Sequence, residues 1–238
     1  MDQNLNFMAQ VPEEQLEVFV ETLIEKGGLT EMLSVSDEYK KYGKNYVAYW
    51  ERIEKEYRAF GSNTITSAFS GPNTYRDILI LVLKQCNVKY SESDSIERME
   101  ELLLESILKD MWEKLSREER IALFSDLKAD IKNIDFNSIG GITSSMLIQI
   151  FRAGGFASYK ITLIIVNAIA KAILGRGLSL AANAGIVKGI SILVGPIGII
   201  VTALWSVYDL AGPAYRVIIP CTILIAAYRK MGLTNNDF

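Results

Sequence analysis

The sequence predicts an all-α fold: a multi-helix bundle with a buried apolar helical hairpin, broken by glycine and proline, in its C-terminal half. Three observations predict this class. Apolar residues recur at helical spacing, glycine and Gly-Pro pairs separate the resulting segments, and no run of useful length alternates as a strand does. The hydrophobic share of 50% and the charged share of 22% are typical of a globular chain, and 238 residues can bury a sizeable core.

Charge divides the chain into two regions. Residues 1–135 carry 17 Lys and Arg against 26 Asp and Glu, whereas residues 136–238 carry 8 against 2. No acidic residue lies between Asp135 and Asp209. We therefore expect an acidic region of amphipathic helices, 1–135, and an apolar, Gly-rich, basic helical region, 136–238, that packs against it, because opposite charges attract over a Debye length of ~10 Å.

The acidic region is expected to begin with an extended lead-in over residues 1–11. Pro12 suits the first turn of a helix, and the Gly-Gly pair at 27–28 suits its end. The apolar stripe of residues 45–60 predicts a second helix, which Gly61 ends.

Two longer helices and a capping signal follow in the acidic region. Residues 75–86 are apolar enough for a core helix, and the stripe over residues 96–114 predicts a long one. Ser116 and Glu119 have the spacing of a capping box, which starts a further helix. The apolar side of that helix is expected at Ile121, Phe124, Leu127 and Ile131.

The basic region predicts five helices, separated by glycine or Gly-Pro. The separators include Gly175, the pair Gly195-Pro196 and the pair Gly212-Pro213. The expected helices cover residues 143–152, 159–174, 178–194, 197–210 and 214–231.

The run from Gly189 to Tyr208 holds no charge. Pro196 divides it, because a proline inside a helix costs ~3 kcal/mol. The two arms of the resulting hairpin, Leu178–Val194 and Ile197–Leu210, are roughly 25 Å and 21 Å long at ~1.5 Å per residue, and neither comfortably crosses a hydrocarbon layer of ~30 Å. The pattern suits a hairpin that is either buried in the bundle or dips into a bilayer from one side. The residues singled out for a membrane or partner contact are Gly185, Gly189, Gly195, Pro196, Gly198 and Trp205.

The flanks of this hairpin are basic, at Lys171, Arg176 and Lys188. Basic flanks favour an anionic membrane surface. The alternative is that these cations face solvent or pair with the acidic region. Both interpretations stay open, as does a protein that hides the hairpin at rest and releases it later.

The composition argues against an enzyme. The chain has no histidine, which removes the commonest general base and metal ligand, and its two cysteines, Cys86 and Cys221, form no CxxC motif. We find no phosphate-binding glycine loop and no basic face with interleaved aromatics, so we expect no catalytic residue, no cofactor, no metal and no nucleic acid. The N-terminus lacks the features of a signal peptide, and we expect a cytoplasmic protein.

Two charged features have structural explanations. The acidic run of residues 92–105 fits a solvated helix face better than a cation site, because a calcium-type loop is missing from the sequence. Arg216 stands between apolar residues, where an arginine usually caps backbone carbonyls or reaches an acid such as Asp209.

Four stretches resemble the YaaW family of bacterial proteins, which has no established function. They are LNFMAQVPEEQLEVFVETL, YRDILILVLKQC, MEELLLESILKDMWEKLSREER and AGPAYRVIIPCTILIAAYRKM. The family is similar, more remotely, to ubiquinol–cytochrome c chaperones, which implies a helical binding module near membranes. The last stretch is the most specific, through Gly212, Pro213, Tyr215, Arg216 and Pro220.

These observations predict a non-enzymatic helical protein that associates with a membrane or membrane protein through its C-terminal hairpin, peripheral to the inner membrane. Conditional insertion or pore formation would be one form of this association. The alternative is a soluble protein-binding or assembly-chaperone-like module, in which the hairpin is permanently part of the core.

Overall fold

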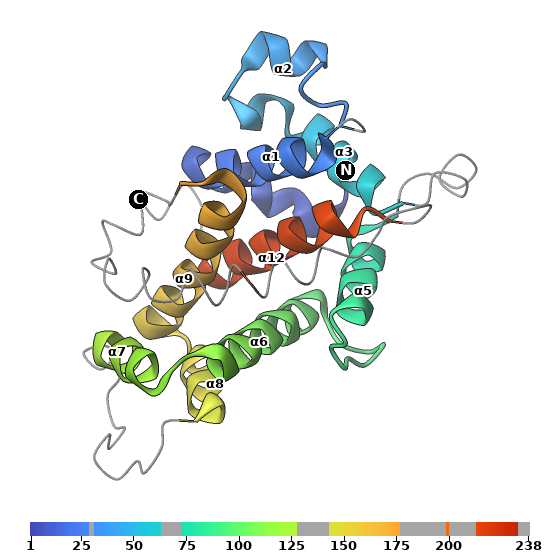
Figure 1. Cartoon of the computed structure of the whole chain (residues 1–238). Helices are drawn as coiled ribbons and strands as arrows, with labels where there is room; N and C mark the ends of the chain where they lie inside the picture. The colour runs from blue at the N-terminus through green and yellow to red at the C-terminus, as the bar shows by residue number, and fades with distance from the viewer. Residues whose placement is uncertain (29–30, 63–72, 128–142, 177–198, 200–212, 233–238) are drawn as a thin grey trace. The chain divides into compact units, whose positions relative to one another are not determined.

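A computed structural model describes residues 1–28, 31–62, 73–127, 143–176, 199 and 213–232 (Figure 1). These residues form helices and their connections, without a strand among them, which confirms the predicted all-α class. The elements are η1 Gln3–Gln10, α1 Glu13–Gly27, α2 Asp37–Tyr42, η3 Tyr46–Tyr49, α3 Trp50–Phe60, α5 Tyr75–Gln85, α6 Ile96–Lys114, α7 Arg117–Leu127, α8 Ser144–Ala153, α9 Gly155–Leu174 and α12 Tyr215–Met231.

Contacts divide the chain into two compact units. The first comprises Met1–Leu103 and Thr202–Phe238, and the second comprises Leu104–Val201. Helix α6 runs from the first unit into the second. The boundary that composition predicts near residue 136 lies in residues 128–142, outside the described part of the chain, and it stays a prediction.

The first unit is built around α12, the last helix of the chain. It packs against α1, α3, α5 and η1, and Figure 1 shows the red α12 running beside the blue α1. Every residue from Val217 to Tyr228 is buried. A helix that is apolar on all sides must be enclosed, and here the N-terminal helices enclose it. The basic C-terminal region therefore supplies the central helix for the acidic one.

The prediction of an extended lead-in is wrong. Residues Gln3–Gln10 form the 3-10 helix η1. The Asp2 carboxylate starts it by accepting a hydrogen bond from the backbone N–H of Asn4. Leu5 and Met8 are fully buried in the core, so tertiary packing holds this short helix in a stretch without a long apolar stripe.

Three predicted helix ends in the first unit are confirmed. Helix α1 starts directly after Pro12, and Gly28 follows it with a φ of 57°, a conformation that favours glycine. The expected helix over residues 45–60 is split into η3 and α3, and Gly61 follows α3. Helix α2 was not predicted; its N-cap is Ser36.

Helices α6 and α7 begin where the sequence predicts. Ser116 and Glu119 form the expected capping box: the Ser116 N–H donates to the Glu119 carboxylate at 2.7 Å, and the Glu119 N–H donates to Ser116 Oγ at 3.2 Å. The Trp112 and Phe124 rings meet edge to face at 5.6 Å. Ile121 contradicts its predicted inward position, because 52% of it is exposed.

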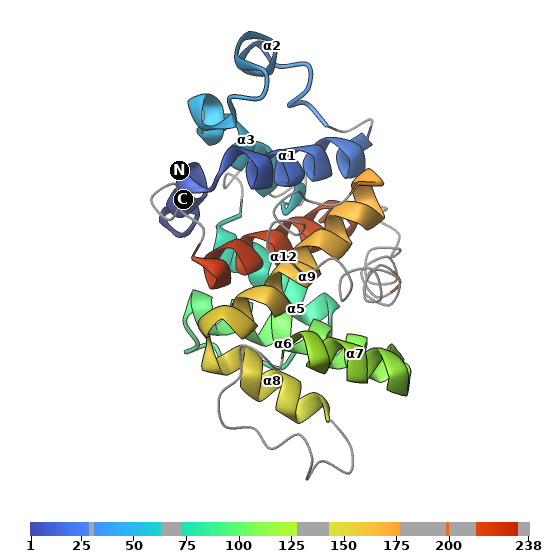
Figure 2. The same cartoon turned by 90° about the vertical axis from the view of Figure 1, so that its left-hand side faces the viewer.

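In the second unit, α8 and α9 pack against each other (Figure 2). Gly154 separates the two helices. Helix α9 starts at Gly155, earlier than the predicted residue 159. Ser158 Oγ donates to the Phe151 carbonyl at 2.7 Å and ties the two helices together. Residues 161–170 are all buried, which confirms a buried apolar helix in the C-terminal half.

Candidate functional site

The predicted hairpin lies almost entirely outside the described residues. This holds for Gly185, Gly189, Gly195, Pro196, Gly198, Trp205 and Gly212. Within the predicted arms, Ile199 is described: it is helical, and 61% of it is exposed. The hairpin itself therefore remains a prediction.

Four of the family-motif residues lie at or in α12. Pro213 precedes the helix, and the next N–H, that of Ala214, donates to the Phe60 carbonyl at 2.8 Å. Tyr215 is the first helical residue. Pro220 lies inside the helix, buried, and α12 continues past it to its end at Met231. Enclosure on all sides therefore maintains the helix despite the backbone donor that a proline lacks.

Arg216 links α12 to the end of α1. Its Nε donates to the Lys26 carbonyl at 2.8 Å, and its Nη2 donates to the Gly27 carbonyl at 3.3 Å. The last carbonyls of a helix have no partner within the helix, and a cation there also complements the helix dipole. The interpretation of Arg216 as a carbonyl cap is thus confirmed.

A buried charged centre lies where α6 meets α5 and α12. Glu100 on α6 is 2% exposed. Tyr75 Oη donates to its Oε1 at 2.6 Å, and Arg229 Nε donates to its Oε2 at 2.7 Å. Burial raises the pKa of the Glu100 carboxyl, although Arg229 and the Tyr75 hydroxyl act in the opposite direction. The solvated-face interpretation of the acidic run is therefore wrong at this position.

Arg229 extends this centre to the N-terminal segment. Its Nη2 donates to the Asn4 carbonyl at 2.6 Å, and its guanidinium lies 4.1 Å from the centre of the Phe7 ring. The next residue, Lys230, pairs with Glu101 at 3.0 Å in a partly exposed bridge. The basic end of α12 is thus joined to two acids of α6.

A second acid of the same run is also buried. Glu105 accepts two hydrogen bonds from Arg152 of α8, from Nε and Nη2, each at 2.6 Å. Such bidentate contacts fix geometry as well as charge. Sequence analysis missed both buried acids, although Glu100 has the helical spacing of the buried positions Leu104, Ile107 and Met111, and that register was the available signal.

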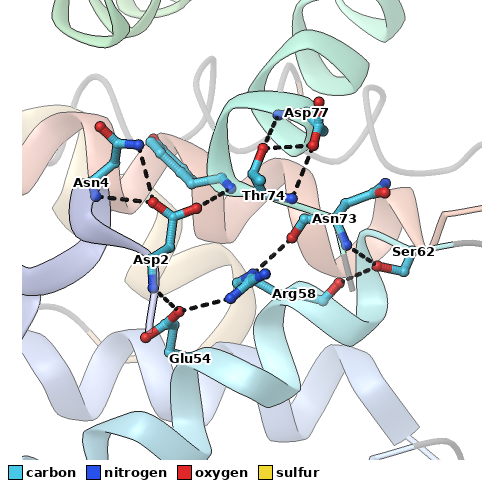
Figure 3. A network of polar contacts seen from close by, with 9 residues as sticks. Asp2, Asn4, Glu54, Arg58, Ser62, Asn73, Thr74 and Asp77 are labelled. Carbon is cyan, nitrogen blue, oxygen red and sulfur yellow. Dashed lines mark hydrogen bonds and ion pairs between the residues drawn. The ribbon is translucent and has the colours of Figure 1, made fainter. Parts of the chain in front are cut away.

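A third polar network closes the N-terminal segment onto α3 and α5 (Figure 3). Asp2 Oδ2 accepts from the Tyr75 N–H at 2.7 Å, and the Asp2 N–H donates to Glu54 Oε1 at 2.6 Å. Arg58 donates to Glu54 at 3.2 Å and to the Asn73 carbonyl at 2.7 Å. Burial tends to raise the pKa of Asp2, but the backbone donors outweigh it and lower the pKa. The network organises the start of α5, and Glu54 Oε2 is left buried without a hydrogen-bond partner among the described residues.

Two chemical features of the described residues bear on catalysis: clusters of metal-binding side chains and the pKa values of buried hydroxyl and thiol groups. The described residues contain no group of three or more His, Cys, Asp and Glu that could hold a metal ion. Burial raises the pKa of Tyr57, Tyr75 and Cys221 well above their usual values, which keeps these groups protonated. An activated nucleophile needs the opposite shift.

Helix α9 has the composition of a membrane-spanning segment. It has 20 residues, and an 18-residue window of it has a mean hydropathy of 1.5. Of that window, 72% is buried within the protein. A core helix of a soluble protein passes the same test, so length and composition leave both roles open.

The first turns of α9 carry an aromatic–basic cluster, formed by the exposed Phe156 and the half-buried Tyr159 and Lys160. Phe156 is 53% exposed. Its ring stacks on that of Tyr159, with centroids 5.9 Å apart and planes 6° apart. Lys160 Nζ lies 4.9 Å from the centre of the Phe156 ring. The buried apolar helix thus ends in a surface that combines aromatic rings with a positive charge.

The first unit carries a second surface, which we call the tyrosine surface, over residues 31–49; Tyr42 in it is exposed, whereas Tyr46 and Tyr49 are buried. Tyr39, Tyr42 and Tyr46 surround Tyr49, with ring centroids 6.5, 6.1 and 6.2 Å away. Helix α2 contributes no buried residue, and both views place it at the margin of α1 and α3 (Figures 1 and 2). The large exposed apolar residues of this surface are Met32, Val35, Tyr42 and Val47.

Comparison with known proteins finds similar chains over nearly the whole length. A UPF0174 protein of Helicobacter pylori strain J99 is 38% identical over 99% of this chain and 94% of its own. A second from the same strain is 33% identical over 85% of this chain and 98% of its own. UPF0174 protein YaaW of Escherichia coli K12 is 29% identical over 97% and 94%. No family model and no solved structure matches the sequence.

Proposed function

This chain belongs to the UPF0174 family, and we propose that it is a non-enzymatic helical protein that associates with a membrane or membrane protein through its apolar C-terminal part. It is cytoplasmic and peripheral to the inner membrane. The association is conditional, because the protein also has a state in which its apolar helices are enclosed.

The observation that carries the proposal is α9. Residues 161–170 of this helix are all buried within the protein. The helix is nevertheless long and apolar enough to cross a membrane. The charge-free run of residues 189–208 follows it in the sequence. Both segments are too apolar to face water, and a lipid bilayer can bury such surface as a protein core does.

Ile199 supports the proposal from within the charge-free run. Its exposure of 61% leaves a large aliphatic side chain in contact with water. A contact with an acyl chain would remove that surface from water, which is favourable by about 25 cal/mol per Å².

Flotation of the full chain with anionic vesicles at low salt tests the proposal, at neutral pH and in mild acid. We expect the protein to rise with the vesicles in at least one condition. Recovery at the bottom of the gradient in both conditions would refute the membrane role.

A matched pair of variants sharpens this test. Ile199→Asp places a charge in the charge-free run, and Ile121→Asp places one at a similarly exposed position of α7. We expect the first to weaken flotation and the second to leave it unchanged. Equal effects would mean that general hydrophobicity, and not this run, drives the association.

A second candidate function is a protein-binding or assembly-chaperone-like module, and the exposed apolar residues of the tyrosine surface, Tyr42 among them, favour it. Tyrosine is enriched at the centres of protein interfaces, because it gives a large contact area at low entropic cost. In this alternative the C-terminal part stays in the core. Tyr42→Ser with Val47→Ser would then abolish copurification of a defined partner, whereas Gly195→Leu would lower only the stability.

A further inference from the structure

We infer that the aromatic–basic cluster of α9, Phe156, Tyr159 and Lys160, contacts anionic phospholipid headgroups and orients the protein on the membrane. The inference rests on the proposed membrane association and names both the lipid class and the side chains that meet it. The cluster lies at the start of the helix, with Phe156 exposed and Tyr159 and Lys160 half-buried, and its geometry and charge suit that partner.

The arrangement of the three side chains in the cluster suits a membrane–water interface. Aromatic side chains prefer that interface, where a ring can lie among the upper acyl carbons while polar groups stay hydrated. Phe156 and Tyr159 present parallel rings 5.9 Å apart, and Tyr159 adds a hydroxyl. Lys160 lies over the Phe156 ring, with its charge next to the apolar surface. A lysine stem can cover such a surface while its ammonium reaches a phosphate.

The charge of the surrounding sequence favours an anionic surface over a neutral one. No acid occurs in the sequence from residue 136 to residue 208. Arg152, four residues before Phe156, keeps half of its side chain exposed beyond its pair with Glu105. The cluster therefore combines two aromatic rings with one lysine, and residues 136–208 contribute no acid that would repel a phosphate.

Exposure alone does not explain the cluster. Ile121 in the same unit is almost equally exposed, but it lies on α7, three residues after Glu118 and four after Arg117. Its side chain is aliphatic, so it offers neither an aromatic ring nor a positive charge. Ile121 therefore provides a control of matched exposure and different chemistry.

The test compares binding of full-length variants to vesicles of pure phosphatidylcholine and to vesicles that contain about 30% phosphatidylglycerol. The variants are Lys160→Glu, Lys160→Arg and Phe156→Ser, with Ile121→Ser as the control. Urea unfolding of each variant verifies that it is folded.

We expect Lys160→Glu to weaken binding to the anionic vesicles by about tenfold or more, since it reverses one charge at the surface. Lys160→Arg should bind as the wild type does, Phe156→Ser should bind more weakly to both vesicle types, and Ile121→Ser should have no effect. The difference between Lys160→Glu and wild type should shrink at high salt.

Two outcomes separate this inference from the proposed function. If the wild type floats and Lys160→Glu and Phe156→Ser float equally well, the cluster is not the lipid contact, while membrane association stands. If the wild type binds neither vesicle type, both fail. A loss for Lys160→Glu that is equal on neutral and anionic vesicles would also overturn the assignment of anionic headgroups.

Discussion

Arg229→Ala removes three contacts at once from the core of the first unit. It removes the partner of a carboxylate that is 2% exposed, at a distance of 2.7 Å. It also removes a hydrogen bond to the Asn4 carbonyl and the contact with the Phe7 ring. These losses fall on η1 and on α6, so the substitution weakens the attachment of α12 to both.

The expected magnitude follows from leaving Glu100 buried without its cation. Breaking a buried ion pair by removing one partner costs about 3–5 kcal/mol. The Arg229 side chain is 22% exposed, so water partly solvates the original pair. We therefore expect a loss near the lower limit, about 3 kcal/mol. Lys230→Ala is the matched control, because its bridge is partly exposed and should contribute less than about 1 kcal/mol.

The pH dependence gives an independent check. Burial raises the pKa of Glu100, so the folded state binds its proton more readily than the unfolded state does. The contribution of Glu100 to the free energy of unfolding therefore falls as pH rises from its pKa in the unfolded state through its pKa in the folded state. Removing Arg229 raises the folded pKa further, because Arg229 lowers it in the wild type. The loss caused by Arg229→Ala should thus become smaller as pH falls from neutral to about 5.

Urea unfolding followed by circular dichroism at both pH values measures these differences. The reasoning would be refuted if Arg229→Ala and Lys230→Ala agreed within about 0.5 kcal/mol at neutral pH. It would also be refuted if the loss for Arg229→Ala grew on acidification.

Three further predictions concern packing and hydrogen bonds in the first unit. Gly61→Ala should lower the free energy of unfolding by about 1–3 kcal/mol, because a Cβ at this position would clash with Ile78 Cγ1. Urea unfolding should show a smaller loss when Ile78 is also replaced by Ala. Arg216→Ala should lower the free energy of unfolding by about 1.5–3 kcal/mol and speed hydrogen exchange at the end of α1. Arg216→Lys should restore little of this stability, because a lysine cannot donate to both carbonyls in the forked geometry of a guanidinium. Tyr57→Phe should cost about 1 kcal/mol by urea unfolding, because its hydroxyl lies 2.8 Å from Thr222 Oγ1 in the core; no measurable loss would contradict that bond.

Much of the helical order could be predicted from local signals. The capping box of Ser116 and Glu119 and the glycine at position 28 act within one turn of the backbone, so the residues alone specify them. Thr143 was predicted only as part of a helix, and it acts as the N-cap of α8. These ends depend on hydrogen bonds between near neighbours, which a sequence displays directly.

The errors have a common physical cause: they depend on residues far away in the sequence. Helix η1 is held by the burial of Leu5 and Met8 in a core to which α12 contributes. Glu100 is buried because Arg229, 129 residues later, neutralises it. An acidic run without its partners is indistinguishable from a solvated face, and only the register of Glu100 with the buried side of α6 distinguishes the two.

The aromatic–basic cluster of α9 illustrates the same limit for the candidate site. The sequence indicates an apolar helix with basic residues nearby, but it does not show that Phe156 is exposed or that Lys160 covers its ring. Those facts depend on where α8 turns into α9, at Gly154. The start of α9 at Gly155, earlier than predicted, adds Phe156 to the helix.

The most direct test of the account is the depth of Trp205 in a membrane. Replacing the buried Trp50 and Trp112 by Phe leaves Trp205, in the charge-free run, as the only tryptophan of the chain. Its fluorescence is then recorded with anionic vesicles whose acyl chains carry bromine, a contact quencher. We expect strong quenching with anionic vesicles and weaker quenching with neutral vesicles. Unchanged fluorescence in a protein that floats with the anionic vesicles would contradict it.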